Sequence, residues 1–273
     1  MAWRKQGEQT AAATAADSPF LQTLQRLRDE RLTAAVAVSA RDSDSTARTF
    51  LFQGRVYAVA LEGYEPGLAD RMLSAGRITT AQRDELAALA RDDVGPVAES
   101  RGWISAEDLA LLHQEYLLAS FGALVSADLT DIAVEDAATT HRLCTLPLDL
   151  DPLLDTVAMR AQRTADTWSG LRVWATPATA SFQGTGGEVP EALRIPELLA
   201  LLAELTEPRT LDQAAHALGL TRAEAVQLAA AAMRADVLRA VGTPRLAEVF
   251  PDGVETYRVP EQYPLAREIA PAA

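Results

Sequence analysis

Two helix-start signals separated by one glycine constrain this chain more than any other feature. Thr210 is followed three residues later by Gln213, and Thr221 is followed in the same way by Glu224. This spacing is typical of a capping box, in which the side chains of the first and fourth residues bond each other's backbone N–H groups at a helix start. Gly219 is expected to end the first helix, because glycine readily adopts the left-handed conformation found there. The pattern predicts two short helices joined by a tight turn.

Further elements complete this C-terminal module. Ile195-Pro196 leads into a helix with an apolar face formed by Leu198, Leu201, Leu202 and Leu205. After Leu238, Arg239-Ala240-Val241 is expected to return through Gly242-Thr243-Pro244 as a small hairpin. With these elements, residues 193–250 resemble the winged helix-turn-helix folds of many bacterial regulators. The resemblance implies transcription regulation by DNA binding, with the third helix, which starts after Thr221, in the major groove.

A helical projection gives the residues of this module that would contact DNA. Ala223, Gln227, Ala230 and Arg234 are expected on the outer face of the third helix, opposite its core face. The candidate DNA-binding residues are Arg209, Thr221, Arg222, Gln227, Arg234, Arg239 and Arg245. Residues 193–245, however, contain six basic and six acidic residues. Phosphate contacts supply much of the affinity for DNA, so firm binding would need a homodimer that presents two modules. The alternative is a module used for protein contact or dimerisation.

Glycine and proline mark the predicted domain boundary. Residues 183–191, Gln-Gly-Thr-Gly-Gly-Glu-Val-Pro-Glu, contain three glycines and one proline, a composition that disfavours regular structure. We therefore expect an interaction domain over 18–182, a linker over 183–192 and the winged-helix domain over 193–250. Residues 1–17 and 251–273 are expected to be tails. The predicted fold class is α+β.

The first half of the sequence changes from strand-forming to helix-forming segments. A helix is expected from Pro19, followed by strands over 32–40, 48–52 and 56–60 that form a small antiparallel meander. From residue 65 the pattern is helical, with a weak repeat in which Gly76-Arg77-Ile78-Thr79 corresponds to Gly102-Trp103-Ile104-Ser105. Each copy combines a glycine helix end, an apolar residue and a Ser or Thr cap. Another strand is expected over 131–135, and a helix is expected to begin at Pro152 with Asp151 as its cap.

This order of elements resembles the PATAN family, named for the amino-terminal domain of PatA-type bacterial response regulators. The similarity covers about residues 18–180 and includes Phe52-Gln53-Gly54-Arg55-Val56-Tyr57-Ala58 and, more loosely, Arg163-Thr164-Ala165-Asp166-Thr167-Trp168. The helical repeat is also similar to the N-terminal domain of secretion ATPases. The PATAN resemblance implies a non-catalytic interaction or sensory role in bacterial signalling, with a protein partner and no catalytic residues.

Charge and composition exclude several function classes. The chain has 273 residues and a formal net charge of −13, which disfavours a protein that mainly coats nucleic acid or a membrane surface. The acidic excess lies within 61–137, which is either a solvated helical surface or a docking face for a basic partner. No uninterrupted apolar run approaches the length of a membrane span. Cys144 is the one cysteine, which fits a cytoplasmic location.

Candidate catalytic and metal-binding residues do not form a convincing site. His141 and Cys144 are close in sequence, but a metal would need two further ligands. Gly184-Thr185-Gly186-Gly187 lacks the Lys and Ser or Thr of a phosphate-binding loop. We therefore expect no enzymatic activity, no cofactor and no metal. The sequence favours a cytoplasmic bacterial regulatory protein, either a transcriptional regulator or, alternatively, a signalling adaptor in a small-GTPase or response-regulator circuit.

Overall fold

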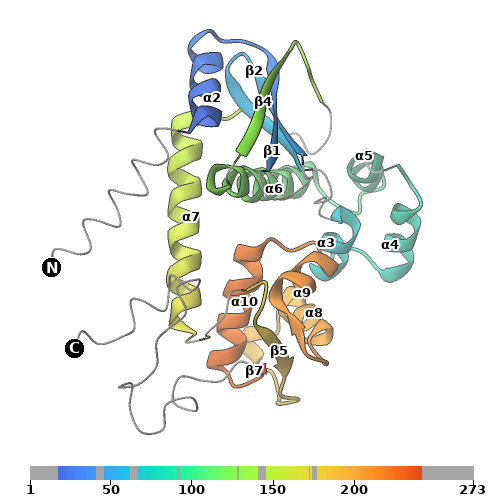
Figure 1. Cartoon of the computed structure of the whole chain (residues 1–273). Coiled ribbons are helices and arrows are strands. Elements are labelled where there is room, and N and C mark those ends of the chain that lie inside the picture. The colour runs from blue at the N-terminus through green and yellow to red at the C-terminus, as the bar shows by residue number, and fades with distance from the viewer. Residues whose placement is uncertain are drawn as a thin grey trace, which may run out of the picture. The chain divides into compact units, whose positions relative to one another are not determined.

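The computed structural model divides the chain into two compact units (Figure 1). It describes residues 18–40, 46–61, 67–90, 93–127, 129–140, 146–171, 173 and 177–241. The first unit comprises Met1–Pro66 and Ala88–Met159, and the second comprises Gly67–Ala87 and Arg160–Ala273. Both mix helices with a small antiparallel sheet, as the predicted α+β class requires.

The first unit contains a four-stranded antiparallel sheet in the order β3-β2-β1-β4. Its strands are β1 (Ala34–Ala40), β2 (Thr46–Phe52), β3 (Arg55–Leu61) and β4 (Leu129–Asp136). The predicted meander and the later strand are confirmed, and β4 pairs antiparallel with β1. The reversal between β2 and β3 requires Gly54, whose φ is +77° and whose added Cβ would lie 2.7 Å from the Arg28 carbonyl oxygen.

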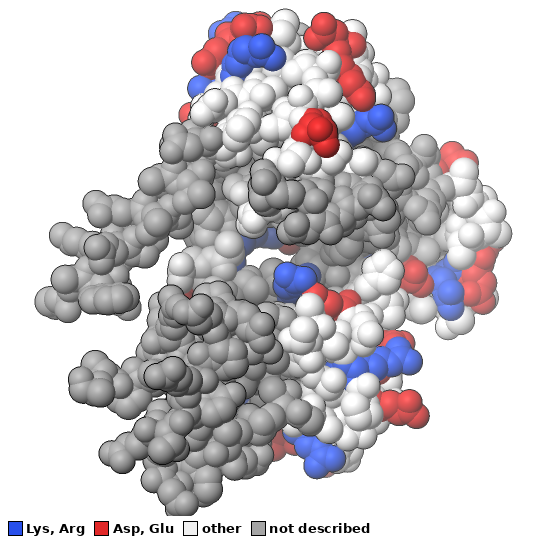
Figure 2. All heavy atoms as spheres, in the orientation of Figure 1, with Lys and Arg blue, Asp and Glu red and all other residues white. Residues whose placement is uncertain are grey.

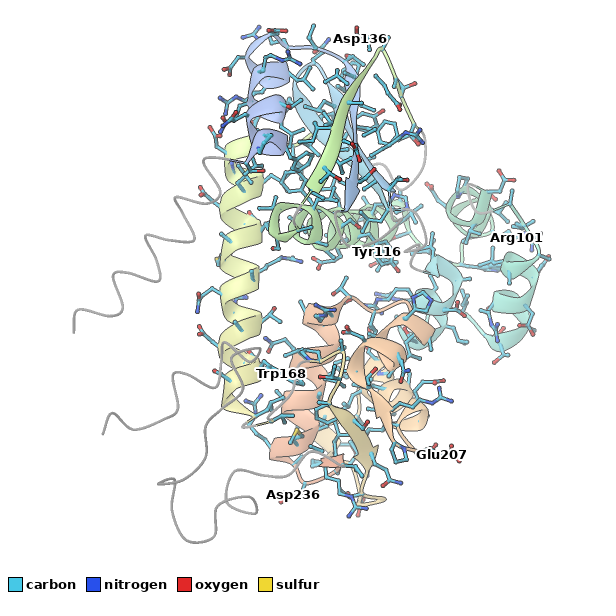
Figure 3. All side chains as sticks on the ribbon, in the orientation of Figure 1. Arg101, Tyr116, Asp136, Trp168, Glu207 and Asp236 are labelled. Atoms are coloured by element: carbon cyan, nitrogen blue, oxygen red, sulfur yellow. The ribbon has the colours of Figure 1, made fainter. Side chains whose placement is uncertain are left out.

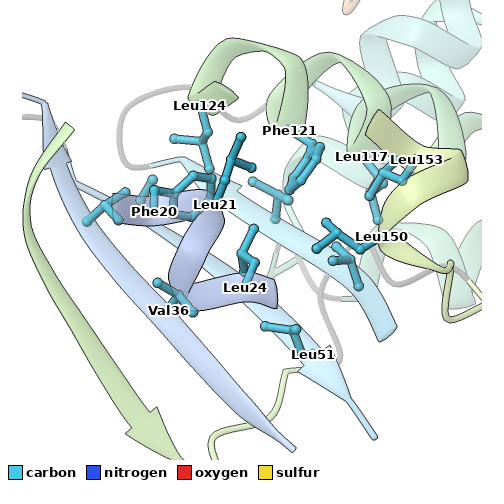
Figure 4. Packing of buried hydrophobic residues seen from close by; sticks show 14 of the residues in the cluster. Phe20, Leu21, Leu24, Val36, Leu51, Leu117, Phe121, Leu124, Leu150 and Leu153 are labelled. Atoms are coloured by element: carbon cyan, nitrogen blue, oxygen red, sulfur yellow. The ribbon is translucent and has the colours of Figure 1, made fainter. Parts of the chain in front are cut away.

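One face of this sheet and the surrounding helices enclose the core of the first unit (Figure 4). The helices are α2 (Pro19–Asp29), α6 (Ala106–Ser126) and the first part of α7 (Leu150–Gly170). The first unit also contains α5 (Val94–Ser100). Phe20 of α2 and Phe121 of α6 are both fully buried, with ring centroids 6.4 Å apart. Among the described residues, α6 is the one helix long and apolar enough to cross a membrane. Its buried side chains Leu117, Leu118, Phe121 and Leu124 lie in this core.

The second unit combines two segments far apart in the sequence. The first is the pair α3 (Leu68–Ser74) and α4 (Thr80–Ala87). The second comprises the end of α7, a 3-10 turn over Glu191–Leu193, the helices α8 (Pro196–Glu204), α9 (Leu211–Ala217) and α10 (Arg222–Arg234), and the strands β5 (Ser181–Gly184), β6 (Arg209–Thr210) and β7 (Leu238–Val241). The strands form an antiparallel sheet in the order β6-β5-β7. The core includes Trp168, whose ring packs edge-on against Phe182 with centroids 5.9 Å apart (Figure 3).

The domain organisation differs from the predicted boundary at 183–192. The two units divide inside α7, between Met159 and Arg160, and the 67–87 segment belongs to the second unit although its neighbours in sequence belong to the first. Gln183 and Gly184, the first residues of the predicted linker, lie in the central strand β5. Glycine content indicated a linker, but Phe182 is fully buried and fixes the start of this segment in the core.

The start of α7 also differs from its prediction. The helix begins at Leu150, two residues before Pro152, so Asp151 lies inside the first turn. The Asp151 carboxylate accepts a hydrogen bond from Arg28 Nη1 at 2.7 Å. The pKa of the Arg28 guanidinium is raised, first by its hydrogen bond to Asp29 and also by the charge of Asp151. Asp151 is therefore an ion-pair partner of α2, and the capping prediction is wrong.

Several predictions concern residues that the structure does not describe. The two predicted tails, 1–17 and 251–273, lie outside the described residues. The same holds for His141, Cys144, Arg245 and the return of the predicted hairpin over 242–244. The helices of the predicted winged-helix domain are present, but β7 pairs with β5, which precedes them in the sequence. The winged-helix assignment stays a prediction.

Candidate nucleic-acid interface

The two predicted capping boxes are confirmed at the starts of α9 and α10. The Thr210 side chain accepts a hydrogen bond from the Gln213 N–H, and its own N–H donates to Gln213 Oε1. The Thr221 N–H donates to Glu224 Oε2 at 2.8 Å, and its Oγ1 accepts from the Glu224 N–H. Gly219 between the helices has a φ of +64°. The two capped helices α9 and α10 and the tight turn between them are therefore present as the sequence predicts.

The N-terminal end of α10 is covered by α3, which the sequence analysis assigned to the other domain. Arg71 of α3 donates from Nη2 to Glu224 Oε1 at 2.9 Å and from Nη1 to Glu197 Oε1 at 3.4 Å. The Arg71 side chain is 11% exposed, and each of the two glutamates is 25% exposed. A buried arginine between two carboxylates balances charges that would otherwise be expensive to bury.

Two further contacts fix α3 against the turn between α9 and α10. Ser74 Oγ donates to the Leu218 carbonyl oxygen at 3.1 Å. An added Cβ on Gly219 would lie 2.6 Å from the Gly67 carbonyl oxygen, so the two backbones meet without space for a side chain. Thr221, predicted to contact a phosphate, is 3% exposed. The turn between α9 and α10 is therefore already covered by α3 of the same unit.

The arginines of the candidate interface have polar neighbours on the same unit. Arg222 forms a two-point ion pair with Asp212, with Nε to Oδ1 at 2.9 Å. Arg209 Nη1 donates to Glu204 Oε2 at 2.8 Å, and Arg239 Nη2 donates to Gln183 Oε1 at 3.3 Å. Arg234, at the last position of α10, is exposed. On the face seen in Figure 2, acidic side chains lie beside the basic ones.

The predicted base-reading face of α10 is partly covered. Ala230, expected on the outer face, is fully buried. Gln227 is exposed, but its Nε2 donates to Thr167 Oγ1 in α7 at 2.8 Å. The helical projection placed both residues opposite the core because it considered one helix alone. In the structure, the end of α7 runs beside α10 and occupies that side (Figure 1).

Arg71 is the residue of this region that the sequence analysis missed. It lies among buried apolar residues of α3, namely Leu68, Ala69 and Met72. An arginine within such an apolar stretch is a signal for a buried ion pair. Its two acidic partners, however, lie 126 and 153 residues further along the chain, so local spacing could not identify them.

No group of three His, Cys, Asp or Glu side chains that could hold a metal ion occurs among the described residues. The two described histidines, His113 and His216, lie on α6 and α9, which belong to different units. Gly184 of the glycine-rich segment lies in β5, and Thr185 Oγ1 donates to the Asp236 carbonyl oxygen at 2.8 Å. These contacts give the glycine-rich segment a role in the sheet of the second unit.

Comparisons with protein-family models, with curated proteins and with solved structures found no match to this chain.

Proposed function

We propose that this protein is a non-enzymatic regulatory adaptor of the bacterial cytoplasm that acts through protein–protein contacts. The observation that carries the proposal is the partly covered outer face of α10, where Ala230 is fully buried and Gln227 bonds Thr167. A recognition helix needs that face to reach base edges in a groove. In this protein the middle of that face, at Ala230 and Gln227, contacts other parts of the second unit.

Electrostatics support the same proposal. Glu224 lies in the first turn of α10 and Glu197 in the first turn of α8, and Arg71 of α3 bonds both carboxylates. If α3 moved away, the Glu224 carboxylate would remain without this cation at the end of the helix that would have to meet phosphates. The net charge of −13 would add repulsion at longer range. For the first unit, the PATAN resemblance suggests a signalling protein as the partner.

A transcriptional regulator is the second candidate function. The two capping boxes around Gly219 favour it, because they build the compact helix–turn–helix that such regulators use. The exposed side chains of Arg222 and Arg234 are the residues through which α10 would contact DNA. To contact DNA, Arg222 would have to break its ion pair with Asp212 and form one with a phosphate.

A DNA titration at two salt concentrations distinguishes the two functions. For an adaptor, the full-length protein gives no change in fluorescence anisotropy with duplex DNA, even at low salt and at concentrations that favour dimers. For a regulator, binding is seen and weakens steeply with salt. In that outcome, Arg222→Ala lowers the affinity for all sequences and reduces the salt dependence, whereas Gln227→Ala relaxes sequence preference. Such a result would replace the adaptor proposal.

A further inference from the structure

Helix α3 is attached to the C-terminal part of the second unit from outside the core of that part. The described residues of this core all lie between Trp168 and Ala240, so none of them belongs to α3. Polar contacts help to attach α3, namely the two ion pairs of Arg71 and the hydrogen bond that Ser74 donates to the Leu218 carbonyl oxygen. The C-terminal part therefore forms its core without α3, which covers its surface.

The length and the chain position of α3 are those of a short helical ligand. The helix Leu68–Ser74 has seven residues, and an isolated helix of this length is not stable in water. The segment that carries it, Gly67–Ala87, belongs to the second unit although the residues before and after it belong to the first. Its helical form therefore depends on the surface that it contacts, as in a peptide helix bound in a groove.

We propose that this surface is a docking site for a helix of a partner protein, and that α3 is a built-in ligand that the partner displaces. The surface is called the α3 seat and consists of the starts of α8 and α10 and the turn between α9 and α10. The inference rests on the proposed adaptor function, for which it names the binding surface and the chemistry of the partner.

The contacts of α3 define that chemistry as one arginine in an otherwise apolar helix face. Glu197 and Glu224 are each 25% exposed and face the seat, so they select a cation. Arg71 reaches the two carboxylates with different nitrogens, Nη1 and Nη2, a geometry that favours a guanidinium over a lysine ammonium. Leu68 and Met72, on either side of the arginine, are buried, so the flanking positions require apolar residues.

A peptide added in trans tests whether the seat accepts such a helix. In the wild type, α3 is tethered beside the seat at an effective concentration of about millimolar, so a labelled peptide of residues 67–87 should bind weakly in fluorescence anisotropy. Arg71→Glu in the full-length protein adds a third carboxylate and should release α3. This variant should therefore bind the peptide about tenfold more tightly than the wild type or better. No binding to a variant that is folded by circular dichroism would overturn the proposal.

Two further variants keep this test decisive. If Arg71→Glu does not fold, Arg71→Gln removes the charge with a smaller disturbance and should show the same gain. Arg48→Glu is the matched control, because it makes the same charge change at a 58% exposed ion pair of the first unit. It should bind the peptide no more tightly than the wild type does, and an equal gain in this control would contradict the assignment to the α3 seat.

The peptide itself tests the required arginine. A peptide of residues 67–87 with Arg71→Gln keeps the apolar residues but lacks the guanidinium that bonds both carboxylates. It should bind the opened variant about tenfold more weakly than the unchanged peptide. Equal affinities would show that the seat does not recognise an arginine and would overturn the partner chemistry.

Hydrogen exchange of the wild-type protein tests displacement without any variant. If α3 leaves its seat while the core from Trp168 to Ala240 stays folded, its amides exchange through a local opening. The amides of Arg71–Ala75 should then exchange faster than those of the buried residues Ala229 and Ala232 in α10. Equal protection would mean that α3 is released only by global unfolding, and the displacement proposal would fall.

A DNA titration of the opened protein separates this inference from the proposed function. Arg71→Gln is used because it adds no negative charge. Binding of duplex DNA at low salt would mean that α3 covers a DNA-binding surface, and both the inference and the adaptor function would fall. Peptide binding without DNA binding supports both. Binding of neither would overturn the docking inference alone, because an adaptor can use another surface.

Discussion

At the residue scale, Arg71 is the side chain that joins α3 to both α8 and α10 in the second unit. It is 11% exposed and bonds the carboxylates of Glu197 and Glu224, which are themselves mostly buried. Arg71→Ala leaves two carboxylates close together with no cation between them. We expect the free energy of unfolding to fall by about 2–3 kcal/mol, somewhat less than for a fully buried pair because the glutamates retain contact with water. Denaturant unfolding followed by circular dichroism measures this loss.

Arg209→Ala is the matched control for Arg71. Arg209 forms one ion pair, with Glu204 at 2.8 Å, and its side chain is 49% exposed. Exposed pairs of this kind contribute about 0–1 kcal/mol, so this variant should unfold nearly as the wild type does. Similar losses in the two variants would mean that the buried position of Arg71 adds nothing to its ion pairs.

Gly219 permits a second matched comparison at the residue scale. Gly219 and Gly186 both have positive φ angles, +64° and +74°. A Cβ on Gly186 would meet no atom within 4 Å, whereas one on Gly219 would lie 2.6 Å from a backbone oxygen. Gly186→Ala should therefore lower the free energy of unfolding by about 1 kcal/mol, from backbone strain alone. Gly219→Ala should lower it by clearly more, and equal losses would show that α3 moves away from the turn easily.

At the scale of the element, the capping boxes predict unequal effects of one substitution. Thr210→Ala and Thr221→Ala each remove a helix cap, which contributes about 0.5–2 kcal/mol. The Thr221 hydroxyl also lies 3.0 Å from Glu224 Oε2, in a part-buried position beside Arg71. Thr221→Ala should therefore lower the free energy of unfolding more than Thr210→Ala. Ser at either position keeps the cap and should recover most of the loss; no recovery would assign the effect to packing of the Thr methyl group.

The elements were predictable from sequence where their causes are local. The caps at Thr210 and Thr221 act over three residues, and the meander follows from short strand patterns around Gly54. The pairing of β5 with β7 was not predictable in this way, because Phe182 and Ala240 lie far apart in sequence. The covered side of α10 was missed for the same reason. Its neighbours come from α3 and α7, and a helical projection contains no information about them.

At the scale of the whole molecule, the second unit should not fold from the C-terminal part of the sequence alone. A fragment of residues 183–273, the region from the predicted linker onward, lacks Trp168, Phe182 and all of α3. It therefore loses an aromatic pair of the core, half of the central strand β5 and the cation between Glu197 and Glu224. We expect this fragment to show no cooperative thermal transition by circular dichroism. A fragment of residues 160–273 regains Trp168 and Phe182, so it should be more helical per residue, yet less stable than the full chain because α3 is still absent. If 183–273 instead unfolds cooperatively at the temperature of the full-length second unit, the domain boundary lies at the glycine-rich segment after all, and the packing of α3 and α7 on α10 contributes little to stability.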